Sequence, residues 1–310
     1  MTRIFQYGSD IICHDPGPEM IPFFREIDPD YHVESAWRGS TFRPRFKKLS
    51  NSYIYTDRDL FGMSVLEIKK LFQRQGGKEP VNGSKNTYSK LDLLSVLALK
   101  YMADCRLCGW QCGVNRYNGS GKCGLGMKLY YRQPFIHIAE EPSINPAIVV
   151  NFSGCAMRCC YCIDHDLWET DNLDLVSSGN FWQRIEQLMR WEYPINTLEF
   201  ANPTESLPAI LHLLRDAPDN FNLPIVFNSH LYGAEPFYEI AAEIADVWLP
   251  DLRYGNDQCA KELSRVDNYM AYAENGLKRM AYSKASIIVR ILVLPGHVEC
   301  CIKPALELLS

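Results

Sequence analysis

The pattern of apolar and polar positions changes near residue 146. Before that point, apolar residues recur at helical spacing in 63–74 and again in 89–102, where Ser89 stands at the N-cap. After it, short β-branched or apolar runs alternate with amphipathic stretches, which is typical of strand–helix–strand units in a parallel sheet. The predicted strands are 147–152, 197–200, 224–227, 246–249 and 286–294. The predicted helices between them lie near 181–191, 207–215, 236–245 and 268–282.

This order predicts an α/β fold in which residues 146–310 form a partial (β/α) barrel. Reactive groups in such a barrel gather at the carboxyl ends of the strands. Residues 105–145 are expected to form a Cys- and Gly-rich knuckle and a linker, and residues 1–104 an N-terminal α+β extension without an assigned role. The basic stretch from Arg43 to Lys48 is interpreted as a solvated face rather than an RNA site.

The composition is that of a globular protein and excludes disorder as the overall state. The 310 residues are 47% hydrophobic and 22% charged, and 32 Lys and Arg face 37 Asp and Glu for a formal net charge of -5. No global basic excess favours nucleic acid or an anionic membrane. The first residues lack an apolar stretch of signal-peptide length, and no apolar run is long enough to span a bilayer. We therefore expect a soluble cytoplasmic protein with neither a membrane nor a nucleic acid as partner.

Cysteine is unusually frequent, with 12 residues in the chain. Clustered cysteines in a cytoplasmic protein indicate metal binding or catalysis rather than disulfides. Seven of them fall into two tight groups, which we call the motif cysteines (Cys155, Cys159 and Cys162) and the knuckle cysteines (Cys105, Cys108, Cys112 and Cys123). The others lie outside both spacing patterns, namely Cys13, Cys160, Cys259, Cys300 and Cys301.

The three motif cysteines have a C-x3-C-x2-C spacing directly after the first predicted barrel strand. Three thiolates can hold three irons of a [4Fe-4S] cluster and leave the fourth iron with an open position. That open iron can chelate an amine together with a carboxylate, a pair that the amino-acid end of S-adenosylmethionine offers. A zinc site or a set of buried thiols is the alternative interpretation.

The same spacing, with Tyr161 directly before the last cysteine, resembles the signature of the radical S-adenosylmethionine superfamily. Further stretches occur in the order found in proteins related to pyruvate formate-lyase activating enzyme. They are 105–116, 121–124, 199–208, 224–229, 248–254 and 289–296. The resemblance covers roughly residues 100–300 and implies a radical SAM type of partial barrel.

The resemblance implies that the motif cysteines ligate a [4Fe-4S] cluster and that Cys160 is a bystander. It also implies a group of residues that contact S-adenosylmethionine or substrate, namely Tyr161, Asn202, Asn228, Asp251 and Arg290. Strand-end capping or paired barrel charges are the alternative roles for Asn228, Asp251 and Arg290. For His165 and His230, near strand ends, hydrogen-bonded packing is favoured over catalysis.

One departure from the family pattern concerns the second barrel strand. The family usually carries Gly-Gly-Glu at its end to receive the methionine ammonium, whereas this chain has Phe200-Ala201-Asn202. The amide oxygen of Asn202 can accept a hydrogen bond, but it lacks the negative charge that would strengthen the contact.

The four knuckle cysteines lie within nineteen residues among several glycines that permit tight turns. Four thiolates close a coordination shell, so this group has no open position for radical chemistry. A structural zinc ion and an auxiliary iron–sulfur cluster both fit.

The function implied by the resemblance is that of a radical SAM enzyme of oxidoreductase type. A reduced [4Fe-4S] cluster would donate one electron to S-adenosylmethionine and produce methionine and a 5'-deoxyadenosyl radical that abstracts a hydrogen atom from substrate. The implied partners are an electron donor such as flavodoxin or ferredoxin and a substrate that is a glycyl residue of a partner protein, a peptide or a small molecule. The alternative is a non-catalytic iron–sulfur or zinc protein derived from this fold.

Overall fold

The structure is a computed structural model. It describes residues 3–7, 10–14, 42–80, 86–138, 141–170, 173–191 and 195–310. The first two ranges form strands β1 (Arg3–Tyr7) and β2 (Asp10–His14), which pair antiparallel. Cys13 belongs to β2, and its side chain lies outside the described part of the chain.

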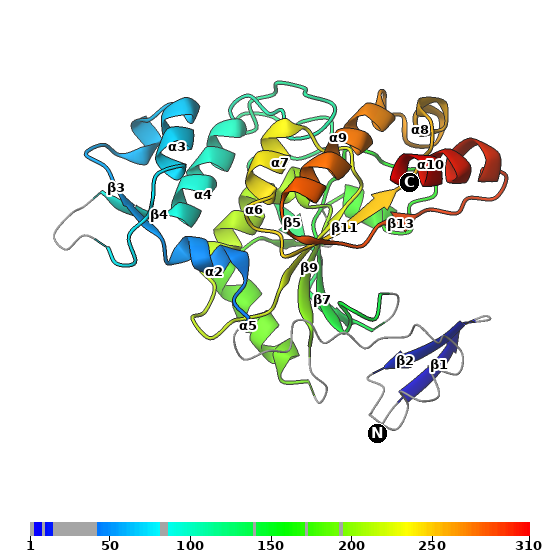
Figure 1. The fold of residues 1–310 in the computed structure, drawn as a ribbon, viewed down its shortest axis with the longest axis horizontal. Helices are drawn as coiled ribbons and strands as arrows, with labels where there is room; N and C mark the ends of the chain where they lie inside the picture. Colours follow the sequence, from blue (N-terminus) through cyan, green and yellow to red (C-terminus); the bar gives the residue numbers. More distant parts are fainter. Residues whose placement is uncertain are drawn as a thin grey trace.

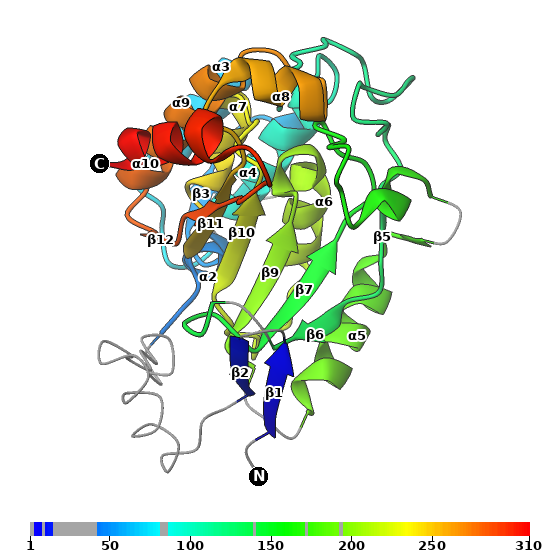
Figure 2. The same cartoon turned by 90° about the vertical axis from the view of Figure 1, so that its right-hand side faces the viewer.

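A mixed sheet forms the centre of the remaining chain (Figure 2). Its strands in spatial order are β12 (Ser286–Ile287), β11 (Val247–Leu252), β10 (Ile225–Ser229), β9 (Thr197–Ala201), β7 (Ala147–Asn151) and β6 (Phe135–His137). Neighbours from β12 to β7 pair in parallel, which confirms the predicted α/β class with a parallel sheet. Strand β6 pairs antiparallel with β7 and was not predicted. The barrel remains a prediction.

The parallel register brings the carboxyl ends of the strands to one edge. Asn151 of β7 lies opposite Ala201 of β9, and Ala201 lies opposite Asn228 of β10. Figure 2 shows β7, β9, β10 and β11 side by side, with their arrowheads directed toward the end of the molecule where α8 lies. Residues that follow these strands therefore meet at that end.

The prediction of one strand over 286–294 is wrong. Two short strands, β12 and β13 (Arg290–Ile291), pair with successive parts of β11 instead. Asp251 of β11 lies opposite Arg290 of β13. In the run 286–294, Ser286 and Val293 are exposed and the other residues are half-buried, so its apolar residues do not require one continuous ladder.

Helices alternate with the parallel strands along the chain. They are α5 (Ser178–Met189), α6 (Pro203–Arg215), α7 (Glu235–Ala241), α8 (Asp257–Ser264) and α9 (Tyr269–Tyr282). Helix α6 begins a turn earlier than predicted because Pro203 occupies its first turn, where a missing N–H costs no hydrogen bond. Helix α8 was not predicted, nor was the π-helical turn η3 (Val298–Ile302) that leads into α10 (Lys303–Leu309). Smaller elements are β5 (Tyr130–Tyr131), β8 (Asp174–Leu175) and the 3₁₀ turn η2 (His165–Trp168).

The N-terminal elements pack on the helices of the central sheet (Figure 1). They are β3 (Tyr53–Tyr55), the 3₁₀ turn η1 (Leu60–Gly62), α3 (Val65–Phe72), β4 (Thr87–Ser89) and α4 (Lys90–Tyr101). Ser89 caps α4 as predicted, since its hydroxyl accepts the Asp92 N–H and the Asp92 carboxylate accepts the Ser89 N–H. Helix α4 buries Leu93, Leu94 and Leu97 and contacts α6 and α7.

The basic stretch that was expected to be a solvated face forms helix α2 (Arg45–Ser50). That expectation is wrong for two of its cations. The Arg45 guanidinium donates to the Ser283 carbonyl at 2.6 Å, and the Lys47 ammonium donates to the Pro218 carbonyl at 2.7 Å. The same helix buries Phe46 completely. Tertiary packing thus uses these charges to satisfy loop carbonyls.

Within the described residues, no helix combines the length and the apolar character that a membrane span requires.

Replacing Asp246 with Ala should destabilise the fold by about 2 to 4 kcal/mol, because two buried backbone donors would lose their acceptor. The Asp246 carboxylate accepts the Ile225 N–H at 2.9 Å and the Arg45 N–H at 3.0 Å, and so joins α2 to β10. Urea unfolding followed by circular dichroism measures the change. Asp246→Asn should cost less, because one acceptor oxygen remains, and Asp219→Ala at an exposed position serves as control. An Asp246→Ala protein as stable as the control would contradict this assignment.

Candidate metal and cofactor site

The motif cysteines lie in the loop that follows β7. Gly154 has a φ of +76°, and a Cβ there would stand 2.5 Å from the Leu125 Cγ, so only glycine fits this approach. The next residue, Cys155, donates its N–H to the Cys123 carbonyl at 3.2 Å. The loop of the motif cysteines and the knuckle are therefore adjacent.

Hydrogen-bond donors converge on the buried thiol of Cys159. The Arg253 guanidinium, after β11, donates to its Sγ at 3.2 Å, and the Ser264 hydroxyl at the end of α8 donates at 2.8 Å. The Cys155 Sγ accepts the Met157 N–H at 3.4 Å. Burial raises the pKa of Cys155 to about 12 and also raises that of Cys162. N–H and cationic donors of this kind stabilise metal-bound thiolates.

The residues present fit an iron–sulfur cluster. Three soft thiols stand at the carboxyl end of a parallel sheet, and a guanidinium faces one of them. The Arg253 Nε is buried without a hydrogen-bond partner among the described residues. Burial alone would lower the pKa of Arg253, but the Cys159 thiol and Asp251 raise it well above its ordinary value. A fixed positive charge therefore lies where thiolates would form.

A chain of polar contacts continues from Arg253 across the strand ends. Asp251 accepts from Arg253 at 3.1 Å and from the Arg290 Nε at 2.7 Å. Arg290 also donates to the Asn228 amide oxygen at 3.0 Å, and the Asn228 amide donates to Glu199 at 2.7 Å. The structure thus joins three predicted residues, Asn228, Asp251 and Arg290, in one network.

Glu199 and Arg253 were not predicted as site residues. Glu199 is buried within β9, and burial raises its pKa although the Asn228 amide and Arg290 oppose the shift. The sequence did contain a signal for Glu199, because this glutamate lies at the centre of an apolar strand, where an ionisable side chain requires a partner. Arg253 follows the predicted strand end at Asp251, but nothing in its spacing points to Cys159.

The side chains of Tyr161 and Asn202 are not members of the network of Asn228, Asp251 and Arg290 described above. The Tyr161 hydroxyl pairs with the Tyr254 hydroxyl at 2.6 Å, and burial raises the pKa of Tyr161. Asn202 has left-handed backbone angles, with φ 51° and ψ 55°, and its N–H donates to the Asn228 carbonyl at 3.0 Å. Asn202 therefore lies at the carboxyl end of β9, beside the network.

A buried carboxylate on α6 accepts hydrogen bonds from the motif loop and from the segment after β10. Glu205 Oε1 accepts the Ala156 N–H at 3.0 Å and lies 3.0 Å from the Nε2 of His230, which follows β10. The other histidine nitrogen, Nδ1, accepts the Tyr232 N–H at 3.0 Å, so Nε2 carries the proton that is donated to Glu205. Burial alone would raise the pKa of Glu205, but His230 and the backbone donors lower it.

His230 is thus hydrogen-bonded packing in this structure, the role favoured from the sequence. His165 lies in η2, exposed to solvent, with its ring edge-on to Trp168. Cys160 is also exposed.

The knuckle cysteines lie in a segment without helix or strand. Cys105, Cys108 and Cys123 are buried, and Cys112 is exposed. A Cβ on Gly121 would stand 3.4 Å from the Cys123 Sγ and 3.5 Å from the Cys112 Sγ, so these two thiols face the same glycine. Burial raises the pKa of Cys123 to about 11 and that of Cys108 still further.

Arg116 connects the knuckle to α6. Its side chain is buried and donates to the carbonyls of Gly126 and Glu205. Trp110 donates its indole N–H to the Ala156 carbonyl at 2.7 Å, which ties the knuckle to the motif loop a second time.

Sequence reasoning also missed a group formed by Cys259, His297, Cys300 and Cys301. Their ligand atoms all lie within 4.8 Å of one another. The spacing of 38 residues between Cys259 and His297 gives no local signal, and only the fold brings them together.

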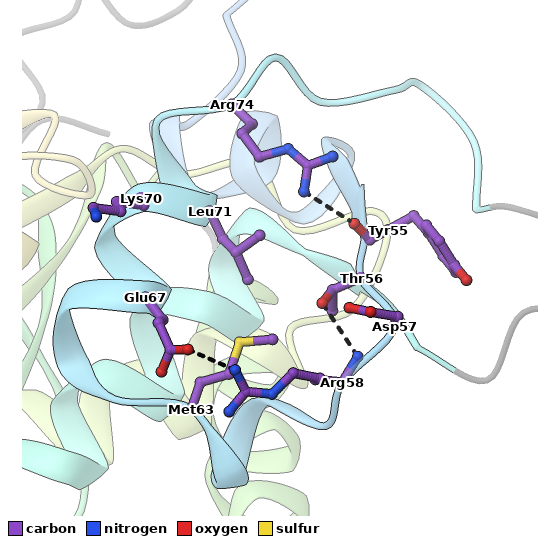
Figure 3. Close-up of a pocket in the computed structure, with 9 residues that line it drawn as sticks. All are labelled: Tyr55, Thr56, Asp57, Arg58, Met63, Glu67, Lys70, Leu71 and Arg74. Carbon is purple, nitrogen blue, oxygen red and sulfur yellow. Dashed lines mark hydrogen bonds and ion pairs between the residues drawn. The ribbon is translucent and has the colours of Figure 1, made fainter.

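A surface pocket of about 530 Å³ lies on the N-terminal elements, and none of its nine lining residues is a cysteine (Figure 3). Its lining residues come from β3, the following loop and α3, and include Arg58, Glu67 and Arg74. Ser64 and Arg58 lower the pKa of Glu67 to about 2. These contacts cap and hold α3, and no side chain of the cysteine groups reaches this pocket.

Comparison with known proteins gives distant matches. No family model matches the chain. The chain is 26% identical over 227 residues to an uncharacterized protein of Methanocaldococcus jannaschii, which covers 71% of this chain and 65% of that protein. It is 23% identical over 152 residues to pyruvate formate-lyase 1-activating enzyme of Escherichia coli K12, which covers 47% of this chain and 60% of that enzyme. The chain spans less than two thirds of the length of these curated relatives.

Among solved structures, native anSMEcpe with bound AdoMet matches with a TM-score of 0.37 and 16% identity, over 50% of this chain and 46% of that chain. The sequence match to the activating enzyme confirms the resemblance to the radical SAM superfamily that was drawn from the motifs.

Replacing Glu205 should separate its hydrogen bonds from its charge. Glu205→Ala removes the acceptor of two buried donors, the Ala156 N–H and the His230 Nε2–H, and should cost about 3 kcal/mol. Glu205→Gln keeps the Oε1 atom, which accepts both hydrogen bonds. Its NH2 group replaces Oε2, an oxygen that has no hydrogen-bond partner among the described residues of the wild-type protein. Glu205→Gln should cost less than about 1 kcal/mol. Chemical denaturation measures both, and equal losses would show that the charge rather than the acceptor stabilises the loop.

Proposed function

We propose that the chain is a radical SAM enzyme whose motif cysteines, Cys155, Cys159 and Cys162, hold a [4Fe-4S] cluster. The observation that carries the proposal is the convergence of Arg253 and Ser264 on the Cys159 thiol at the carboxyl end of the sheet. The sequence similarity to pyruvate formate-lyase 1-activating enzyme supports it. When bound, such a cluster supplies the electron that cleaves S-adenosylmethionine and so gives the radical that abstracts a hydrogen atom from substrate.

The chain's own residues have distinct tasks in this proposal. Arg253 offsets thiolate charge and, with Ser264, fixes the Cys159 side chain in one position. The network at the strand ends carries negative charge on Glu199 and Asp251 and positive charge on Arg290, and Asn228 joins them. The ammonium and the carboxylate of S-adenosylmethionine would need partners of these two signs. The buried side chains of Ala156, Met157 and Cys159 limit the access of water to that part of the loop. A radical SAM partial barrel is the architecture that this proposal implies for residues 146–310.

The branch of the superfamily is part of the proposal. Similarity to an activating enzyme favours an oxidoreductase-type, activase-like activity on a glycyl residue of a partner protein, with a peptide or a small molecule as the other substrate classes. An electron donor such as flavodoxin or ferredoxin would dock near the motif loop. The loop exposes Ile163, which is 92% accessible, next to Cys162 and close in sequence to the exposed Cys160. We place the donor's contact there because the cluster that would receive its electron would lie at this loop.

The knuckle cysteines would hold a second, closed metal site, either zinc or an auxiliary cluster. Three buried thiols and a glycine-rich backbone with little core of its own support a structural role. Because the knuckle contacts the motif loop through Trp110 and Cys123, its metal would also stabilise that loop.

Anaerobic reconstitution with iron and sulfide, followed by reduction with dithionite, tests the proposal. The wild-type protein should bind a [4Fe-4S] cluster whose electron paramagnetic resonance signal changes on addition of S-adenosylmethionine, and it should release 5'-deoxyadenosine, detected by chromatography. Alanine at Cys155, Cys159 and Cys162 together should abolish both. Cys160→Ala is the matched control and should retain both, since this thiol is exposed and outside the spacing. A perturbed signal without any 5'-deoxyadenosine would favour the non-catalytic metalloprotein.

Asn202→Asp should tighten S-adenosylmethionine binding by roughly 1 kcal/mol, because a carboxylate accepts an ammonium hydrogen bond more strongly than an amide does. Asp is chosen over Glu because the residue has a φ of 51°, a conformation that Asn and Asp tolerate better than longer side chains. Titration of the cluster signal gives the affinities. Asn202→Gly keeps the backbone free and removes the acceptor, so it should bind more weakly. Equal affinity in all three proteins would mean that Asn202 does not face the cofactor.

A further inference from the structure

Three cysteines and one histidine from two distant segments form a compact group at the start of α8. Cys259 lies in the first turn of α8, and His297, Cys300 and Cys301 lie at the π-helical turn η3. Cys259 and Cys301 are buried, while His297 and Cys300 are half-buried. Among the described residues, this is the group of potential ligands whose atoms all lie within 4.8 Å of one another.

The distances within the group match one tetrahedral ion. With zinc–sulfur bonds of about 2.3 Å and zinc–nitrogen bonds of about 2.05 Å, two thiolates stand about 3.8 Å apart, and a thiolate stands about 3.5 Å from the nitrogen. The Cys259 and Cys300 Sγ atoms are 3.7 Å apart, and those of Cys300 and Cys301 are 4.0 Å apart. The His297 Nδ1 lies 3.5, 3.4 and 3.8 Å from the Sγ atoms of Cys259, Cys300 and Cys301.

A second layer of contacts holds the group in place. The Asn256 side chain caps α8 by accepting the Cys259 N–H at 2.8 Å, and its amide donates to the Cys300 carbonyl at 2.6 Å and to the Cys259 Sγ at 3.3 Å. One side chain therefore orients ligands from both segments, as outer-layer residues of metal sites do. Gly255 permits the approach, because a Cβ there would stand 2.3 Å from the Cys301 carbonyl oxygen.

We propose that Cys259, His297, Cys300 and Cys301 bind one zinc ion, which fastens η3 and α10 to the start of α8. Three thiolates and one imidazole close a tetrahedral shell, so the ion is structural and leaves no open position for substrate. Soft thiolate ligands exclude magnesium and calcium. A [4Fe-4S] cluster binds each thiolate to a different iron and needs wider spacing than one shared ion, so these distances favour a single ion.

Zinc content of the full-length protein tests this inference without reference to S-adenosylmethionine cleavage. The protein is produced in zinc-supplemented medium, purified without chelator under reducing conditions, and measured by inductively coupled plasma mass spectrometry. Cys259→Ser should lose about one zinc per chain relative to wild type. His297→Cys should keep that zinc, because four thiolates also form a closed shell. Cys160→Ser, which changes an exposed cysteine outside every group, should retain the wild-type content.

The knuckle can bind zinc of its own, so a second variant separates its zinc from that of the Cys259 group. Serine at both Cys105 and Cys108 alters the knuckle only, and the zinc lost with Cys259→Ser should be lost equally in that background. Unchanged zinc in Cys259→Ser, or a loss of iron in place of zinc, would overturn the assignment.

A measurement on the wild-type protein covers the case in which Cys259→Ser does not fold. Alkylation by N-ethylmaleimide, followed residue by residue by mass spectrometry, should leave Cys300 unlabelled in the zinc-loaded protein. Cys300 should become labelled after removal of zinc with a chelator and be protected again when zinc alone is restored. Cys160 should be labelled in all three states, as an internal standard. Equal labelling of Cys300 with and without zinc would overturn the proposal.

Discussion

The arrangement of the motif loop and the knuckle depends on the hydrogen bonds that Glu205 accepts. A single oxygen accepts the backbone N–H of Ala156 in the motif loop and the imidazole N–H of His230 after β10. The backbone carbonyl of the same residue accepts from Arg116 of the knuckle. Three segments that are far apart in sequence are thereby fixed to the first turn of α6. A buried carboxylate requires hydrogen-bond donors, and here the Oε1 atom has two of them.

This negative charge also contributes to the raised pKa values of the neighbouring thiols. Burial is the main cause of the raised pKa of Cys155, Cys108 and Cys123, and the charge of Glu205 adds to it. Without metal, these thiols therefore keep their protons at neutral pH, and metal binding must release protons. The guanidinium of Arg253 places a positive charge at Cys159, where it donates directly to the sulfur. The Glu205 carboxylate and the Arg253 guanidinium thus place opposite charges beside adjacent parts of the motif loop.

The sequence predicts local features of this protein better than its long-range contacts. Helix α4 and its cap at Ser89 follow from periodicity and side-chain chemistry alone, and so does the parallel sheet, because buried strands are continuous apolar runs. The antiparallel edge strand β6 and the break between β12 and β13 depend on pairing partners instead. The same distinction holds at the site. The spacing of the motif cysteines is visible in ten residues, whereas the contact of Arg253 with Cys159 spans 94 positions and the group around His297 joins two segments.

Helix α8 links two of these features through its two ends. Its first turn carries Cys259 of the proposed zinc site, and its last residue, Ser264, donates to the Cys159 thiol. The Leu263 carbonyl also accepts the Cys160 N–H at 2.8 Å, so the helix end holds the motif loop by backbone as well as side chain. A helix of eight residues is too short to be stable alone, and its position is set by what fixes its ends. Fastening Cys259 to η3 would therefore limit the movement of Ser264 against Cys159, so a closed, chemically inert ion would contribute to the geometry of the open cluster site that we propose for the motif cysteines.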